Sequence, residues 1–155
     1  MDPSQANRWE QLARNVKFET HPFIHGDYCQ SSSRDVFQTE NPATSTVLAV
    51  FPDGDADTVD RAVIAARDAF VQWRRLAPEQ RKSLLITVAI QIKVERDALA
   101  LLDCLEMGMP ISMALKKADI AADMMRYYAE SIDKVYGEVA PTDSTSTLAM
   151  SLRQP

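Results

Sequence analysis

The sequence of 155 residues predicts a mainly α-helical chain with a small antiparallel β-meander at its N-terminal end and one extended strand at its C-terminal end. Three observations lead to this prediction. Residues 110–137 repeat apolar side chains at three-four spacing, residues 79–107 contain neither Pro nor Gly, and residues 22–51 hold only short β-favouring runs separated by turn residues.

The helix predicted within residues 110–137 is apolar over more than half of its circumference. Apart from Lys117, its charged residues fall in one sector of roughly a quarter turn: Lys116, Asp119, Asp123, Arg126, Glu130, Asp133 and Lys134. One flank of that sector is formed by Leu115, Ala118, Ala122, Met125, Ala129, Ile132 and Tyr136. Farther round lie Met113, Ile120, Met124 and Tyr127. A helix of this kind needs burial on two sides.

The region from Pro78 to Gly108 allows two interpretations. Apolar and polar residues alternate over residues 86–94, as in a strand, but the length and the absence of breaking residues favour a helix, bent or broken near residues 95–97. A short N-terminal helix is predicted over residues 4–17.

Asp55 is expected to cap a further helix that runs to Trp73. The side of this helix predicted to be buried carries Val59, Val63, Ala66, Phe70 and Trp73. The acidic trio at 53, 55 and 57 is similar to the start of a calcium loop. However, Thr58 and Ile64 occupy the positions where such a loop needs Gly and Glu, so helix capping is favoured.

The β-favouring runs are short. Gly26-Asp27 predicts a hairpin turn, and strands are expected over 36–40 and 47–51, joined at a turn that Asn41-Pro42 opens. Together they would form a small meander, too short to be the sheet of a nucleotide-binding domain. Residues 148–153 read as one more strand, with no evident local partner.

Composition narrows the class of protein. The net charge of −5 offers no basic surface for nucleic acid or for an anionic membrane. Two cysteines make no disulfide framework, which indicates a reducing compartment. The longest apolar run, over residues 84–90, is too short to cross a bilayer, and residues 1–20 lack a signal-peptide core. We therefore expect a cytoplasmic protein.

Residue chemistry alone predicts no catalytic site. The four glycines are not spaced as a phosphate cradle. His21, His25 and Cys29 could in principle bind a metal, but four-residue spacing does not converge along an extended hairpin. Cys104 sits among leucines, where a buried small hydrophobic residue is expected rather than a nucleophile.

The order of the motifs resembles the N-terminal part of an aldehyde dehydrogenase. The motifs are FIHGDYCQ, NPAT, DADTVDRAVIAARDAF, LAPEQRKSLL, LALLDCLEMGMPI, MMRYYAESIDKVYGE and LAMSLRQP, and they cover about residues 22–155. The stretch AESIDKVYGEVAPT is most similar to the branch that acts on γ-glutamyl-aminobutyraldehyde and related amino-aldehydes. The resemblance implies the α/β aldehyde dehydrogenase-like superfamily.

The resemblance also implies a division into three segments. Residues 1–21 would be an N-terminal extension, residues 22–140 the N-terminal part of the cofactor-binding domain, and residues 141–155 a loop and the start of an oligomerisation arm. In the family, the catalytic cysteine, the general-base glutamate and the nucleotide-binding motifs come later, and Cys29 and Cys104 do not match the nucleophile. The chain thus resembles about the first third of an enzyme that oxidises aldehydes to carboxylates with NAD or NADP. The resemblance implies that half of the cover of the helix within residues 110–137 is missing here. We therefore expect this helix to pack partly on the helices at 56–73 and 78–106, and its side with Ile120, Met124 and Tyr127 to stay exposed unless another chain buries it.

By itself the chain is expected neither to turn over aldehydes nor to bind the cofactor productively. Three positions match family sites. Ile120 matches a residue of the aldehyde entrance tunnel, and Glu106, with the backbone carbonyl of Glu40, matches a monovalent-cation site that needs a further ligand from elsewhere. No catalytic or cofactor-binding residue is assigned. The alternative is a non-catalytic interaction module that associates with itself or with full-length homologous subunits.

Overall fold

The computed structural model describes residues 3–154, excluding the side chains of residues 3 and 5, and builds them into five helices and three two-stranded antiparallel sheets. The ends of the first and third predicted segments, residues 1, 2 and 155, lie outside the described residues. The elements are α1 (Pro3–Arg14), β1 (Phe23–Ile24), β2 (Asp27–Tyr28), β3 (Val36–Asn41), β4 (Thr46–Pro52), α2 (Ala56–Trp73), α3 (Pro78–Val94), α4 (Arg96–Met107), α5 (Ile111–Ser131), β5 (Glu138–Ala140) and β6 (Ala149–Ser151).

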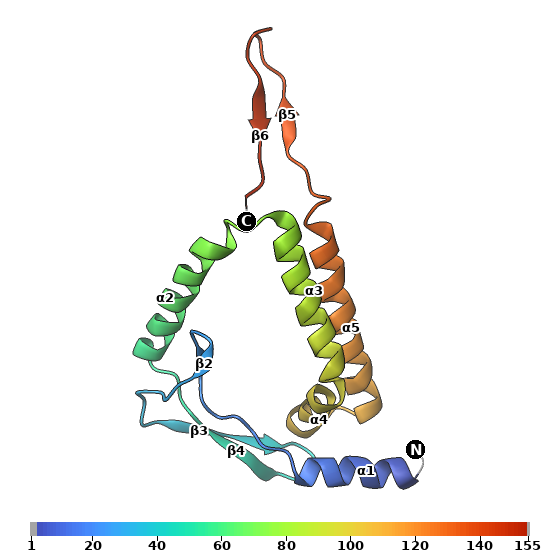
Figure 1. The fold of residues 1–155 in the computed structure, drawn as a ribbon. Coiled ribbons are helices and arrows are strands. Elements are labelled where there is room, and N and C mark those ends of the chain that lie inside the picture. The colour runs from blue at the N-terminus through green and yellow to red at the C-terminus, as the bar shows by residue number, and fades with distance from the viewer. Residues whose placement is uncertain (1–2, 155) are drawn as a thin grey trace.

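The elements form an open frame (Figure 1). Helices α3 and α5 lie side by side, α4 packs against α5 and touches β3, and α1 lies against α4. Helix α2 stands on the opposite side of the frame, and the β5–β6 hairpin projects from one end (Figure 1). Within the described part of the chain no helix is both long enough and apolar enough to span a membrane.

A row of alanines on α5 forms the centre of the helical packing. Ala114, Ala118, Ala122 and Ala129 are buried, as are Ala89 of α3 and Ala100 of α4. Side chains this small let neighbouring helices approach closely. The row includes three members of the flank that the sequence predicts beside the charged sector, so that part of the prediction is confirmed.

Three ion pairs join α3 and the start of α4 to α5 and the turn that follows it: Lys82–Asp133 at 3.2 Å, Lys93–Asp123 at 2.7 Å and Arg96–Asp119 at 2.9 Å. All three carboxylates belong to the predicted charged sector, and the order of the pairs shows that α3 and α5 run antiparallel. The Lys93 ammonium, which donates a hydrogen bond, lowers the pKa of Asp123. Lys134 and Lys82 together lower the pKa of Asp133.

The long helical region breaks at Glu95, within the predicted range. This residue has φ −88° and ψ 12°, which ends α3 and begins α4 in a new direction. Glu95 is hydrogen-bonded to both helices, because its N–H donates to Gln91 O in α3 and its carbonyl accepts from the Leu99 N–H in α4, each at 2.9 Å. Gly108, at φ +68°, ends α4 in the left-handed conformation that glycine adopts without strain.

The N-terminal strands differ from the predicted meander. They form two separate hairpins, β1–β2 and β3–β4, with no strand shared between them. The first turn lies at His25-Gly26, one residue earlier than predicted, because both residues have the positive φ that a two-residue hairpin turn of this type requires. The second turn is as predicted, and the Asn41 side chain accepts a hydrogen bond from the Ala43 N–H at 2.9 Å.

The prediction that the C-terminal strand lacks a local partner is wrong. β6 pairs with β5 in antiparallel register, with Val139 opposite Met150. The base of this hairpin is tight, since a Cβ atom on Gly137 would collide with the carbonyl oxygen of Ser151. The sequence pattern could not reveal this pairing, because β5 is three residues long and has no apolar periodicity of its own.

The chain buries little of its large apolar side chains. Its accessible surface is 11711 Å², about one and a half times the roughly 7,800 Å² expected for a compact monomer of 17.3 kDa. The buried hydrophobic residues among those described are six alanines and Leu101. Much apolar surface therefore has no cover within the chain.

Candidate functional site: two exposed apolar stripes

The first stripe runs along α5. We define the α5 stripe as Met113, Ile120, Met124 and Tyr127, whose exposed fractions range from 53% to 66%. At 100° per residue it lies roughly 155° round the helix from the buried alanines. The contacts with α3 and α4 therefore leave this side free, and the predicted exposure of Ile120, Met124 and Tyr127 is confirmed.

The second stripe runs along α2. We define the α2 stripe as Val59, Val63, Ala66, Phe70 and Trp73. The prediction that this side is buried is wrong, because Val59, Val63 and Phe70 are 42% to 54% exposed. Helix α2 makes its main contact with the short strand β1 rather than with α3 or α5, so nothing in the described part of the chain covers the stripe. The predicted packing of α5 on α3 and α4 is confirmed, whereas its predicted packing on α2 is wrong.

The start of α2 is fastened to the loop before β3. Asp55 caps the helix as predicted, since its Oδ1 accepts a hydrogen bond from the Thr58 N–H at 2.8 Å. Its Oδ2 accepts another from the Ser32 hydroxyl at 2.8 Å. Thr58, followed by Ser32, lowers the pKa of Asp55 to about 2. The carboxylate thus serves as a helix cap.

The two positions matched to a cation site lie on elements that touch. Glu40 is on β3, next to an irregularity in the pairing with β4, and Glu106 is in the last turn of α4. These elements are in contact, and Pro42 Cγ would lie 3.0 Å from a Cβ atom on Gly108. Both glutamates are exposed. Among the described residues there is no cluster of three or more His, Cys, Asp or Glu side chains that could hold a metal.

The other residues considered as metal ligands or nucleophiles are His21, His25, Cys29 and Cys104, and they lie apart in a loop, a hairpin and helix α4. His21 Nδ1 lies 2.8 Å from Glu19 Oε1, and the His21 N–H, which also bonds that carboxylate, lowers the pKa of Glu19. The Cys29 thiol donates to Pro22 O at 3.5 Å, and His25 forms the hairpin turn. Cys104 is half-buried in α4.

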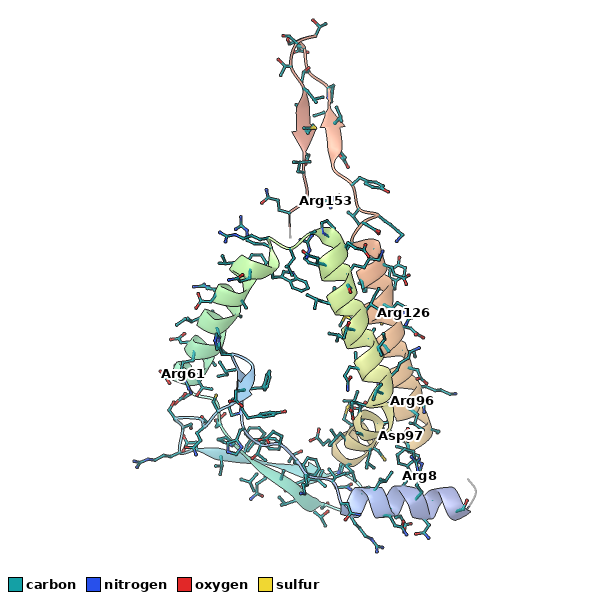
Figure 2. The ribbon with its side chains drawn as sticks, in the orientation of Figure 1. Arg8, Arg61, Arg96, Asp97, Arg126 and Arg153 are labelled. Atoms are coloured by element: carbon teal, nitrogen blue, oxygen red, sulfur yellow. The ribbon has the colours of Figure 1, made fainter. Side chains whose placement is uncertain are left out.

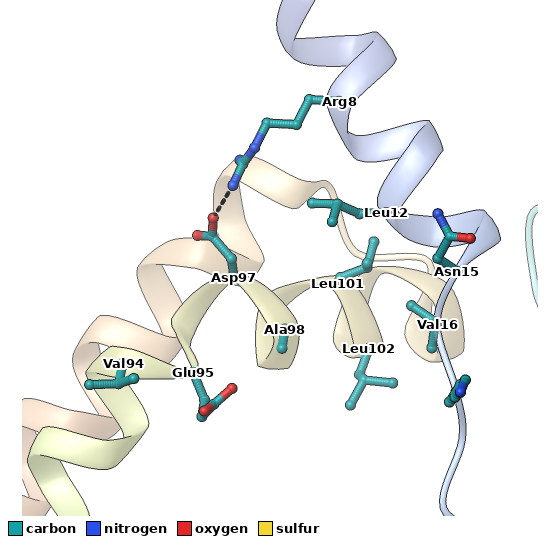
Figure 3. A pocket seen from close by; sticks show the side chains of 11 residues that line it. Arg8, Leu12, Asn15, Val16, Val94, Glu95, Asp97, Ala98, Leu101 and Leu102 are labelled. Carbon is teal, nitrogen blue, oxygen red and sulfur yellow. Dashed lines mark hydrogen bonds and ion pairs between the residues drawn. The ribbon is translucent and has the colours of Figure 1, made fainter.

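A pocket of about 460 Å³ lies between α1 and α4 (Figure 3). Leu12 and Leu101 contribute to its apolar wall, and Arg8 Nη2 reaches Asp97 Oδ2 at 2.6 Å across its rim. The sequence did not indicate this pocket, although Leu12 belongs to the N-terminal helix predicted over residues 4–17. The ion pair joins α1 to α4, and Figure 2 shows where both residues lie.

Comparisons with known proteins agree on one family. The profile described as the aldehyde dehydrogenase family matches residues 28–155. The NADP/NAD-dependent aldehyde dehydrogenase PuuC of Escherichia coli K12 is 40% identical over 151 residues, which are 95% of this chain and 30% of PuuC. The aminoacetaldehyde dehydrogenase of Pseudomonas aeruginosa is 33% identical over 148 residues, 93% of this chain and 29% of that protein.

Solved structures show the same fold. An indole-3-acetaldehyde dehydrogenase in its apo form superposes with a TM-score of 0.87 at 38% identity, covering 93% of this chain and 34% of that one. The aldehyde dehydrogenase KauB of Pseudomonas aeruginosa gives 0.86 at 38% identity, covering 90% and 29%. The chain therefore spans about 30% of the length of the curated relatives that it matches. With this profile and these structures aligned along nearly all of its length, the chain belongs to the aldehyde dehydrogenase family.

Proposed function

We propose that this chain serves as the N-terminal part of an enzyme that oxidises aldehydes, amino-aldehydes among them, to carboxylic acids with NAD or NADP. The observation that carries the proposal is the match to PuuC over 95% of the chain at 40% identity. The aminoacetaldehyde dehydrogenase, at 33% identity, supports amino-aldehydes as substrates. Structures of the similar indole-3-acetaldehyde dehydrogenase in complex with NAD+ support the cofactor.

The proposed contribution of this chain is to shape the enzyme rather than to carry its chemistry. Ile120 would line the aldehyde entrance tunnel, which its position on the uncovered α5 stripe supports. Glu106 and the Glu40 carbonyl would contribute to a cation site, supported by the contact of α4 with β3. The four glycines form no phosphate cradle, so we assign no residue of this chain to the cofactor.

The three predicted segments enter the proposal unchanged: an extension over 1–21, part of the cofactor-binding domain over 22–140 and the start of an oligomerisation arm over 141–155. β5 precedes the last of these boundaries, and its pairing with β6 joins the two segments. We also propose a cytoplasmic location. Cys29 and Cys104 are both free thiols, as suits a reducing compartment.

A chimera tests the proposal. These 155 residues would replace the matching segment of Escherichia coli PuuC, and NADH or NADPH formation would be measured with aminoacetaldehyde. We expect turnover by the chimera and none by the 155-residue chain alone. In the chimera, Ile120→Ala should change KM for the aldehyde, while Ile90→Ala, at a similarly exposed position on α3, should not.

Two results would overturn the proposal. One is a soluble chimera with a cooperative melt that oxidises no aldehyde. The other is robust aldehyde-dependent NADH formation by the purified 155-residue chain.

The exposed hairpin favours a second, non-catalytic candidate function. Val139, Leu148, Met150 and Leu152 are 58% to 70% exposed on the β5–β6 hairpin. A projecting apolar hairpin suits association of the chain with itself or with full-length homologous subunits. Co-purification of the chain with full-length PuuC, lost in Met150→Glu, would support this function, and a monomeric chain that does not bind PuuC would exclude it.

A further inference from the structure

We infer that the pocket between α1 and α4 is a binding site for a straight-chain aliphatic carboxylate. The inference goes beyond the proposed function and does not depend on it. One wall of the pocket comes from residues 8–17, ahead of residues 28–155 that the family profile matches. Neither the proposed tunnel residue Ile120 nor the two glutamates of the proposed cation site line it.

The pocket has the size and the lining of a site for a small molecule. Its volume of about 460 Å³ lies in the range of about 300–1,000 Å³ that is usual for ligand pockets. Apolar side chains from both of its walls face one another: Leu12, Val16, Val94, Ala98, Leu101 and Leu102. An alkyl chain laid between these walls would leave water, which is favourable in proportion to the apolar area that it covers.

The carboxylates around the pocket are both engaged. Arg8 Nη2 lies 2.6 Å from Asp97 Oδ2, and Arg96 Nη1 lies 3.6 Å from Asp97 Oδ1, so two guanidinium groups neutralise this carboxylate. The Glu95 carboxylate accepts a hydrogen bond from Gln91 Nε2 at 3.2 Å. Neither carboxylate therefore requires a cationic ligand.

The free charge at the pocket is a cation. Lys17 is exposed and belongs to none of the ion pairs in the part of the chain that the structure describes. The Asn15 amide donates one N–H to a backbone carbonyl of α1 at 2.9 Å and has a second N–H to offer. Figure 3 shows Asn15 and Val16 at one end of the pocket and Val94 at the other.

This arrangement gives the ligand a direction. Lys17 follows Val16 directly in the chain, so its ammonium and the Asn15 amide can hold an anionic head group at the same end. One ammonium beside one amide suits a singly charged carboxylate, since phosphate esters are held by helix N-termini or several cations. The alkyl chain would then run between Leu12 and Leu101 toward Val94.

Tryptophan fluorescence measures binding. The chain has two tryptophans, Trp9 and Trp73, and the Arg8 guanidinium at the rim of the pocket lies 4.7 Å from the centre of the Trp9 ring. In a Trp73→Phe chain, filling the pocket should therefore change the emission of Trp9. We expect a saturable change with octanoate. Butanoate should bind at least about tenfold more weakly, because it covers less apolar wall. Octanol and octylamine, which lack the anionic head group, should also bind more weakly.

Two variants with matched controls locate the site. Lys17→Met should weaken octanoate binding about threefold to tenfold, as expected for one partly exposed charged hydrogen bond. Lys117→Met makes the same change at another exposed lysine, on α5, and should have no effect. Ala98→Phe fills the pocket and should weaken binding at least about tenfold, whereas Ala121→Phe, at an exposed position of α5, should not. Circular dichroism on each variant confirms that its helices are retained.

Each adverse outcome overturns the inference: no saturable change with octanoate, equal affinity for octanol or octylamine, or unchanged affinity in Ala98→Phe. Should the 155-residue chain show no helical spectrum, calorimetry on the PuuC chimera with the same ligands and variants decides in the same way. An active chimera that binds no octanoate counts against this inference alone. An inactive chimera that binds octanoate counts against the proposed function instead.

Discussion

The row of alanines on α5 makes a sharp prediction about packing. Ala122 is 1% exposed at the contact of α5 with its neighbours, so Ala122→Leu forces three additional carbon atoms into a filled space. Insertion of this kind costs about 1–3 kcal/mol in well-packed cores. For a chain of this length, each kcal/mol lowers the melting temperature by about 2–4 °C. The expected decrease is therefore about 2–12 °C.

The neighbouring residue supplies the control. Ala121 is exposed on the same helix, so Ala121→Leu makes the same chemical change with no steric cost. Thermal melts followed by circular dichroism, with urea denaturation as a second measurement, compare the two variants with the parent chain. Equal melting temperatures for the two leucine variants would refute the view that the alanine row sets the distance between the helices.

Three further predictions concern the charged and capping residues. Acid should weaken the α3–α5 contact, because ion pairing holds the pKa values of Asp123 and Asp133 below the ordinary 3.8, so the unfolded chain takes up protons first as pH falls. The urea midpoint should be constant above about pH 5 and fall below about pH 4, and an equal fall in the Asp123→Asn/Asp133→Asn variant would contradict this. Asp55→Ala should lower the melting temperature and the helical signal, whereas Asp55→Asn should preserve both, since Asn caps helices as well as Asp. If Asp55→Ala kept the melting temperature and helical signal of the parent chain, the cap would be dispensable. Gly108→Ala should destabilise the chain by about 1–2 kcal/mol, because φ is +68° there and the new Cβ would crowd Pro42, and an unchanged urea midpoint would refute it.

The local signals in the sequence were sufficient to predict the helices. Asp55 caps α2 because a carboxylate that precedes a helix accepts from the free N–H groups of its first turn. The helix break near Glu95 and the flank of α5 that carries Ala118, Ala122 and Ala129 were also predicted. These features depend on residues within a few turns of one another, so their physical causes are present in the local sequence.

The candidate site could be predicted only in part. The sequence identified the side of α5 that carries Ile120 as needing cover, and the structure shows it exposed. The periodicity of residues 56–73 likewise predicted that α2 has an apolar side. It did not predict that this side, with Val63 and Phe70, would stay exposed in the described part of the chain. A repeat of apolar residues shows where cover is needed and cannot show whether it is supplied.

The sequence by itself determined where the helices lie, which sides of α2 and α5 are apolar, and where the charged sector of α5 runs. Only the tertiary structure decided that the first strands form two hairpins, that β6 pairs with β5, and that α2 stands apart from α5. The physical reason is the distance along the chain over which each kind of interaction acts. Helix periodicity and caps act over a few residues, whereas strand pairing and helix packing join segments whose complementarity appears only when the backbone brings them together.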